Sequence, residues 1–222
     1  MTASSTPPCV RRAALATGLG LALLGLGCTT APAPADLEAP FQAMLRSSFR
    51  DEGIAKVDRL QQEPGQLACS SGQPLDAATA ARLQAEALAS VKPPSDGRYL
   101  GDWREGEKLA QSGRGMTWSD RSSAASANGG SCYNCHQLTK AEISFGTIGP
   151  SLYQYGKLRG VTDPASAQAR PMVEYTWSRL YNAWSHNACS NMPRFGHKGL
   201  LDEQQLRHLM ALLLDPASAV NQ

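Results

Sequence analysis

The sequence predicts an all-α protein. Apolar residues recur at steps of three and four in several segments, which is the spacing of one face of a helix, whereas no run alternates for long enough to predict a sheet. The chain has 222 residues, of which 42% are hydrophobic, so it can bury one good core. We expect an export signal over residues 1–27, a linker and helical extension over 28–95, and one main domain over 96–222.

The N-terminal residues follow the pattern of an export signal. Arg11 and Arg12 precede an uncharged apolar run over 13–27, which is shorter than the roughly 20 residues that a membrane-spanning helix needs. The run ends at Cys28 in the sequence LGLGC, which approximates the site where bacterial lipoprotein signals are cut and the cysteine is acylated. Gly25 stands where a large aliphatic residue is usual, so lipid attachment at Cys28 and simple cleavage nearby both remain open. We expect a periplasmic protein.

The charge balance gives no reason to propose nucleic acid or an anionic membrane surface as a partner. Arg11 and Arg12 are the only charged residues before Cys28. Without these two, 19 of the 21 basic residues remain, which equals the number of acidic residues, 19. The mature chain therefore has no net formal charge to attract either partner.

The extension is predicted to hold two helices. An Ala/Pro-rich tract at 31–35 is typical of a linker, and apolar spacing then predicts a helix over 41–60 with Gly53 as a candidate break. A loop over 64–74 follows. Asp76 is the expected N-cap of an alanine-rich helix that ends before the prolines at 93–94.

The main domain is expected to begin and end with a helix. The first covers 103–111, and a Gly/Ser/Asn-rich loop over 113–131 separates it from the sequence CYNCH at 132–136. A capping box of Asp202 and Gln205 opens the last helix, which the Asp-Pro pair at 215–216 closes. Its apolar stripe consists of Leu206, Leu209, Met210, Leu213 and Leu214.

The CxxCH sequence is the attachment pattern of a c-type haem. Cys132 and Cys135 can reach the two vinyl groups of one haem, and the adjacent His136 can coordinate the iron. A zinc half-site would need a second ligand pair, and a thioredoxin-like redox pair would lie beside a βαβ pattern, and the sequence has neither. We therefore expect one covalent haem c.

Met192 is the predicted second axial ligand. It lies far downstream of His136, and Pro193 favours an extended loop that holds the thioether away from a helix. A His/Met pair raises the reduction potential and leaves no open coordination position, which favours electron transfer over substrate binding. The other methionine and histidine candidates are Met116, Met172, His186, His197, His208 and Met210.

Other side chains around the haem are less clearly defined. Pro150 is expected to offer its carbonyl oxygen to the second imidazole N–H, which would orient His136. Tyr153, Tyr155 and Trp177 can either wall the haem or fill the core.

The remaining cysteines predict one disulfide. Of 6 cysteines, two belong to the haem motif, and Cys9 and Cys28 belong to the signal or its end, which leaves Cys69 and Cys189. Two leftover cysteines in an oxidising compartment suggest a disulfide, here tying the extension to the loop that carries Met192. A reactive thiol or a cysteine ligand is the alternative.

With these residues in place, the chain resembles class I cytochromes c and, more narrowly, the SoxX family of small cytochrome subunits. The resemblance covers roughly residues 93–221. It rests on YLGDW at 99–103, GEKLAQSGRGM at 106–116, GTIGPSL at 146–152, CSNMPRFG at 189–196 and ALLLDPASAVN at 211–221.

The resemblance implies a class I cytochrome c fold with His136 and Met192 as the axial pair. It also implies a heterodimer with SoxA, whose own site joins thiosulfate oxidatively to a cysteine of the carrier SoxYZ. This chain would be the electron-transfer subunit of that L-cysteine S-thiosulfotransferase, with no catalytic residue of its own, and would pass electrons to a soluble cytochrome c. A free-standing periplasmic electron carrier is the alternative, and a haem enzyme or gas sensor with open iron would require Met192 not to ligate.

Overall fold

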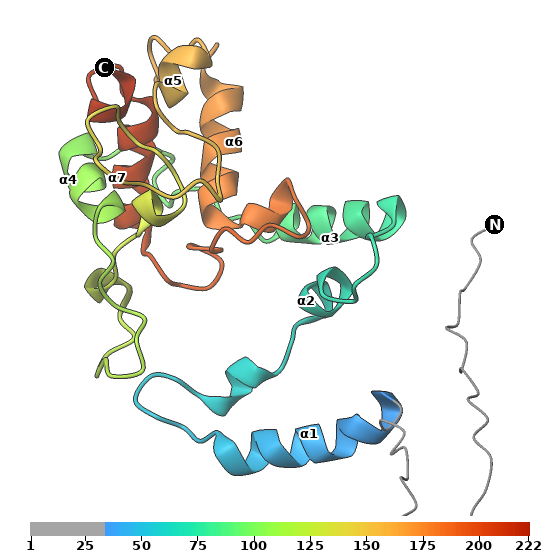
Figure 1. Ribbon diagram of the computed structural model, residues 1–222. Helices are drawn as coiled ribbons and strands as arrows, with labels where there is room; N and C mark the ends of the chain where they lie inside the picture. Colours follow the sequence, from blue (N-terminus) through green and yellow to red (C-terminus); the bar gives the residue numbers. More distant parts are fainter. Residues whose placement is uncertain (1–33) are drawn as a thin grey trace, which may run out of the picture. The chain divides into compact units, whose positions relative to one another are not determined.

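The computed structural model describes residues 34–222, and all regular structure in this range is helical (Figure 1). The only β-type pairing among these residues is an isolated bridge between Glu52 and Ala55. The all-α prediction is therefore confirmed. None of the described helices is both long and apolar enough to cross a membrane. The predicted export signal, Cys9 and Cys28 lie outside the described residues.

The chain divides into two compact units between Arg46 and Ser47. The described part of the first unit is most of α1 (Pro34–Ser48), which carries exposed apolar residues such as Leu37 and Phe41.

The helix predicted over residues 41–60 is interrupted, which confirms the candidate break at Gly53, and its second half is not an α-helix. α1 already begins within the tract predicted as a linker and ends at Ser48. Gly53 then adopts φ +52° in a tight turn, which is left-handed backbone that glycine tolerates best, and the 3-10 helix η1 (Val57–Leu60) follows. The helical spacing of apolar residues continues across this turn, but the α-helical backbone ends before it.

A six-residue helix, α2 (Pro64–Cys69), occupies part of the segment predicted as a loop. Its first turn is stabilised by a capping box, in which the side chains of Glu63 and Gln66 each bond to the backbone of the other residue. Pro64 fits the first position, where no amide hydrogen bond is lost. The loop prediction is wrong over residues 64–69, because the capping box and Pro64 favour the start of a helix despite the glycine at position 65.

Residues 47–95 of the extension belong to the same compact unit as the main domain, so the boundary predicted between residues 95 and 96 falls inside that unit. α3 (Ala77–Ala89) begins at the predicted N-cap Asp76 and packs against the 3-10 helix η4 (Ala183–Ser185). The indole N–H of Trp177 donates to the carbonyl oxygen of Lys92, at 2.8 Å. These contacts join α3 and the segment that follows it to the main domain.

The first and last helices of the main domain are confirmed. α4 (Trp103–Ala110) is capped by Asp102, and α7 (Glu203–Leu214) begins at the predicted capping box and ends before Asp215. The two helices pack against each other, as Figure 1 shows.

Two helices between them have no counterpart in the sequence prediction. They are α5 (Tyr155–Leu158) and α6 (Arg170–Tyr181). In α6, polar Thr176 and Ser178 are buried, and each hydroxyl donates to a carbonyl oxygen of the preceding turn. Because each hydroxyl has a hydrogen-bond partner within the helix, it can be buried in the core. Polar residues at buried positions in turn weaken the apolar spacing from which a helix is predicted.

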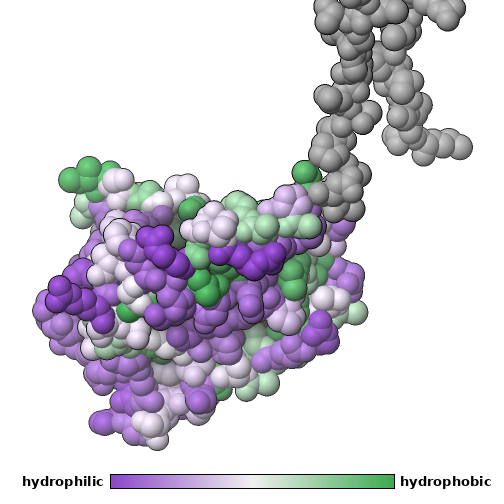
Figure 2. Space-filling view, turned by 90° about the horizontal axis from the view of Figure 1, so that it is seen from below, coloured by the Kyte–Doolittle hydropathy of each residue, from purple (hydrophilic) through white to green (hydrophobic). Residues whose placement is uncertain are grey.

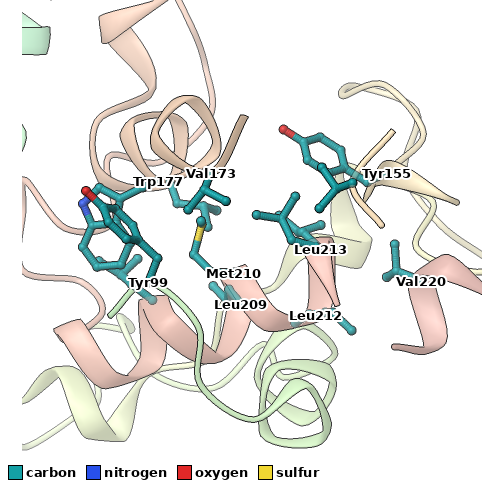
Figure 3. Packing of buried hydrophobic residues seen from close by; sticks show 14 of the residues in the cluster. Tyr99, Tyr155, Val173, Trp177, Leu209, Met210, Leu212, Leu213 and Val220 are labelled. Carbon is teal, nitrogen blue, oxygen red and sulfur yellow. The ribbon is translucent and has the colours of Figure 1, made fainter. Parts of the chain in front are cut away.

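The core forms where α7 meets α6 and the segment before α4 (Figure 3). Tyr99 and Trp177 meet edge to face with ring centroids 5.4 Å apart, and Met210 of α7 is fully buried. On the face shown in Figure 2, hydrophobic areas are interrupted by hydrophilic residues. The exposed apolar side chains of this unit include Trp118, Ile143, Ile148 and Leu158.

Truncation of a core leucine tests this packing. Leu206 is 2% exposed, so Leu206→Ala should lower the free energy of unfolding by about 2–5 kcal/mol in urea denaturation, through lost burial and the cavity left behind. Leu158 is 73% exposed, and the control Leu158→Ala should change stability by less than ~0.5 kcal/mol. Equal effects of the two changes would contradict the described core.

Candidate functional site

One cavity brings the CxxCH motif and Met192 together. It has a volume of about 450 Å³, within the ~300–1,000 Å³ typical of sites for organic ligands. The motif and the segment 187–195, here called the ligand loop, both line it. The residues of these two segments that line this motif cavity are Cys132, Asn134, Cys135, His136, Asn187, Cys189, Ser190, Asn191, Met192, Pro193 and Phe195.

A second, largely apolar cavity of about 120 Å³ shares Cys132, His136 and Met192 with the motif cavity. Its remaining walls come mainly from α6 and α7, including Leu180 and Leu209. This inner cavity extends the site from the motif toward the hydrophobic core, so a large group bound by the motif would have one apolar side.

The two motif cysteines are free thiols on a single tight turn. The 3-10 helix η3 (Cys132–Asn134) carries the first, and the amides of Cys135 and His136 both donate to the carbonyl oxygen of Cys132, at 3.0 and 2.9 Å. Burial raises the pKa of the Cys132 thiol to about 12, which keeps it protonated and neutral at physiological pH. Both thiols lie at the cavity wall.

The imidazole of His136 is oriented as predicted. Its Nδ1 donates to the carbonyl oxygen of Pro150, at 2.7 Å, because a carbonyl can only accept. A Cβ added to Gly149 would lie 2.2 Å from Cε1 of His136, so only glycine lets the backbone approach the ring this closely. Nε2 is left as the nitrogen available to a metal.

Met192 is the only one of the methionine and histidine candidates that lines both cavities with His136. Met210 is fully buried in the core, as predicted. His186 is hydrogen bonded to the hydroxyl of Ser178, at 2.7 Å, and His208 accepts from the amide of Asp102, at 2.9 Å. Met116, Met172 and His197 are absent from both cavity walls.

Two arginines supply positive charge at the cavity walls. Arg179 lines both cavities and Arg159 lines the inner one, yet none of the ion pairs found within residues 34–222 involves either of them. Arg159 donates to the carbonyl oxygen of Tyr155, at 3.1 Å, and Arg179 donates to that of Ala183, at 3.2 Å. Sequence reasoning missed both, because no local pattern marks an arginine that lacks a carboxylate partner.

These donors fit a haem c. The site offers two thiols beside an oriented imidazole, a thioether from the ligand loop, an apolar inner wall, and two cationic groups that could pair with the two propionates of a haem. Within residues 34–222, no group of three or more His, Cys, Asp or Glu side chains is placed to hold a metal ion.

The aromatic residues differ in their roles. Tyr155 is buried and lines the inner cavity, where its hydroxyl lies 3.1 Å from that of Thr176. Trp177 fills the core. Tyr153 instead packs under the ammonium group of Lys140, 4.9 Å from the ring centroid.

Cys69 and Cys189 form a disulfide, with a sequence separation of 120. It joins the end of α2 to the ligand loop three residues before Met192, which confirms the predicted pairing.

No family model matches the sequence. A protein of Aquifex aeolicus (strain VF5) named "Uncharacterized lipoprotein" is 36% identical over 166 residues, which cover 72% of this chain and 73% of that protein. This chain belongs to the family of that lipoprotein.

Removal of the disulfide tests its role in stability. Replacing both Cys69 and Cys189 with alanine should lower the free energy of unfolding by about 3–5 kcal/mol, because the bond closes a long chain segment in the unfolded state. Urea denaturation measures the change. In the unaltered protein, these two cysteines should resist alkylation until a reductant is added, and their alkylation without reductant would contradict the bond.

Proposed function

We propose that this chain is an exported class I-type cytochrome c with one haem, and that it transfers electrons. Cys132 and Cys135 would attach the haem, and His136 and Met192 would ligate its iron. The observation that carries the proposal is the motif cavity, which both ligand candidates line together with both thiols. The packing of α4 on α7 beside this site supports the class I-type fold.

When bound, the haem supplies one-electron chemistry at its iron. The chain's own groups have separate tasks around it. The carbonyl oxygen of Pro150 holds the imidazole of His136 in one orientation, and the thioether of Met192 would be the second ligand of the iron. The apolar wall from α6 and α7 excludes water from one side of the site.

For the biological role, we propose the electron-transfer subunit of SoxAX. The five motifs between residues 99 and 221 that resemble the SoxX family support this role. The partner SoxA would carry the catalytic site that joins thiosulfate to the SoxYZ cysteine. This chain would accept the released electrons and pass them to a soluble cytochrome c.

For the location, we propose the periplasm, with a lipid anchor at Cys28. The relative from Aquifex aeolicus is named a lipoprotein, and Cys28 directly follows the predicted signal.

Substitution of Cys28 tests the anchor. After cell fractionation, the unaltered protein should be found with the membranes, and a Cys28→Ser variant should be found in the soluble fraction.

Haem content and ligation can be tested in one protein preparation. After expression with a cytochrome c maturation system, the intact mass should include one haem, which a Cys132→Ala, Cys135→Ala double variant should lose. In the reduced state, Met192→Ala should gain carbon monoxide binding. It should also lower the reduction potential by on the order of 0.1 V, which is small against the range of ~0.8 V over which axial ligands set haem potentials. Met116 lies outside both cavity walls, so Met116→Ala is the matched control. Avid carbon monoxide binding by the unaltered protein would reject Met192 as ligand.

Partnership separates the two electron-transfer roles. The SoxAX proposal predicts that the haem-loaded chain co-purifies from its native host with a larger c-type cytochrome and forms a stable heterodimer with it in gel filtration. A chain that stays monomeric when mixed with that partner would instead be a free-standing carrier.

A further inference from the structure

We infer that Glu63 and α2 form a positioning element that holds Met192 over the haem site. The inference rests on the proposed function, since it presupposes that Met192 ligates a haem iron. We call the contacts of Glu63, Gly65 and Cys69 with the ligand loop and with Trp184 the α2 clamp.

The first contact of the clamp is covalent. The disulfide from Cys69 reaches Cys189, on the N-terminal side of Met192. It limits how far this side of the loop can move away from α2.

The second contact is ionic and lies on the other side of Met192. A carboxylate oxygen of Glu63 accepts from Nη1 of Arg194, at 2.8 Å, and the other oxygen pairs with Lys198. The guanidinium side chain is only 10% exposed. Mainly the hydrogen bond from Arg194, and then that from Lys198, lower the pKa of Glu63 to about 2, so the carboxylate is charged at neutral pH.

The third contact is aromatic and links α2 to the loop through Trp184. The ring lies under the guanidinium of Arg194, 3.9 Å from the ring centroid, and its Nε1 donates to the carbonyl oxygen of Ser190, at 3.1 Å. Gly65 of α2 faces the same ring, because a Cβ added there would lie 2.5 Å from Cζ3. A larger residue at 65 would push α2 off the tryptophan.

These contacts fix the loop and leave the methionine side chain free to face the cavity. They fall on residues 189, 190 and 194, on both sides of Met192. None of Glu63, Gly65 and Cys69 lines the motif cavity or the inner cavity. A groove of about 400 Å³ lies between α2 and the loop, so discrete contacts rather than continuous packing join them. Glu63, Gly65 and Cys69 would therefore position the ligand from outside both cavities.

The test compares haem-loaded variants of the full chain. Glu63→Gln removes the charge of the ionic contact, and a Cys69→Ala, Cys189→Ala double variant removes the covalent one. Each should raise the carbon monoxide affinity of the reduced protein at least about tenfold, because the gas competes with a thioether that is bound for less of the time. Both should also weaken the absorption band of thioether-ligated ferric haem. Glu86→Gln, which removes the exposed ion pair with Arg82 in α3, is the matched control and should change neither.

The outcomes separate the clamp from the proposed function. Unchanged affinity and band intensity in both folded clamp variants, even with lower stability, would overturn the inference and make α2 a purely structural brace. If the double variant fails to fold, Glu63→Gln decides alone. A wild-type protein without haem, or with no gain in carbon monoxide binding in Met192→Ala, would overturn the proposed ligation first and the inference with it.

Discussion

The hydrogen bond between Nδ1 of His136 and the carbonyl oxygen of Pro150 is the contact on which the candidate site depends. It fixes both the tautomer and the plane of the imidazole, so that Nε2 is the nitrogen left to bind a metal. The bond brings the backbone of Gly149 against the ring, where a Cβ would collide. Without this contact, the imidazole of His136 could turn relative to the two thiols.

The two sides of the cavity are held by different kinds of contact. On the histidine side, the amides of Gly146 and Gly149 donate to carbonyl oxygens of Tyr133 and Cys135, each at 2.8 Å, so the motif is braced by a nearby segment. On the methionine side, the brace comes from α2, more than 100 residues earlier in the chain. Closing long segments costs more entropy than closing short ones, so the methionine side depends more on the completed fold.

This difference also explains what could be predicted from the sequence. The Pro150 contact and the helices α4 and α7 could be predicted, because caps, spacing and short-range motifs carry local signals. α6 was missed since its buried hydroxyls bond within the helix and hide the apolar face. The pair Glu63–Arg194 has no local signature, and only the fold brings its members together. The Cys69–Cys189 bond was predicted by elimination, together with its link to the loop that carries Met192.

The charges around the cavity give an argument for the kind of group it binds that does not depend on any resemblance. Arg194 at the ligand loop is neutralised by Glu63, whereas Arg159 and Arg179 at the cavity walls have no carboxylate partner among the described residues. A bare divalent cation at these walls would be repelled by the two guanidinium groups. A large, mostly apolar group that carries two carboxylates would instead match the wall and pair with both arginines. A haem has these properties, so the electrostatics of the cavity and the donors of the motif support the same occupant.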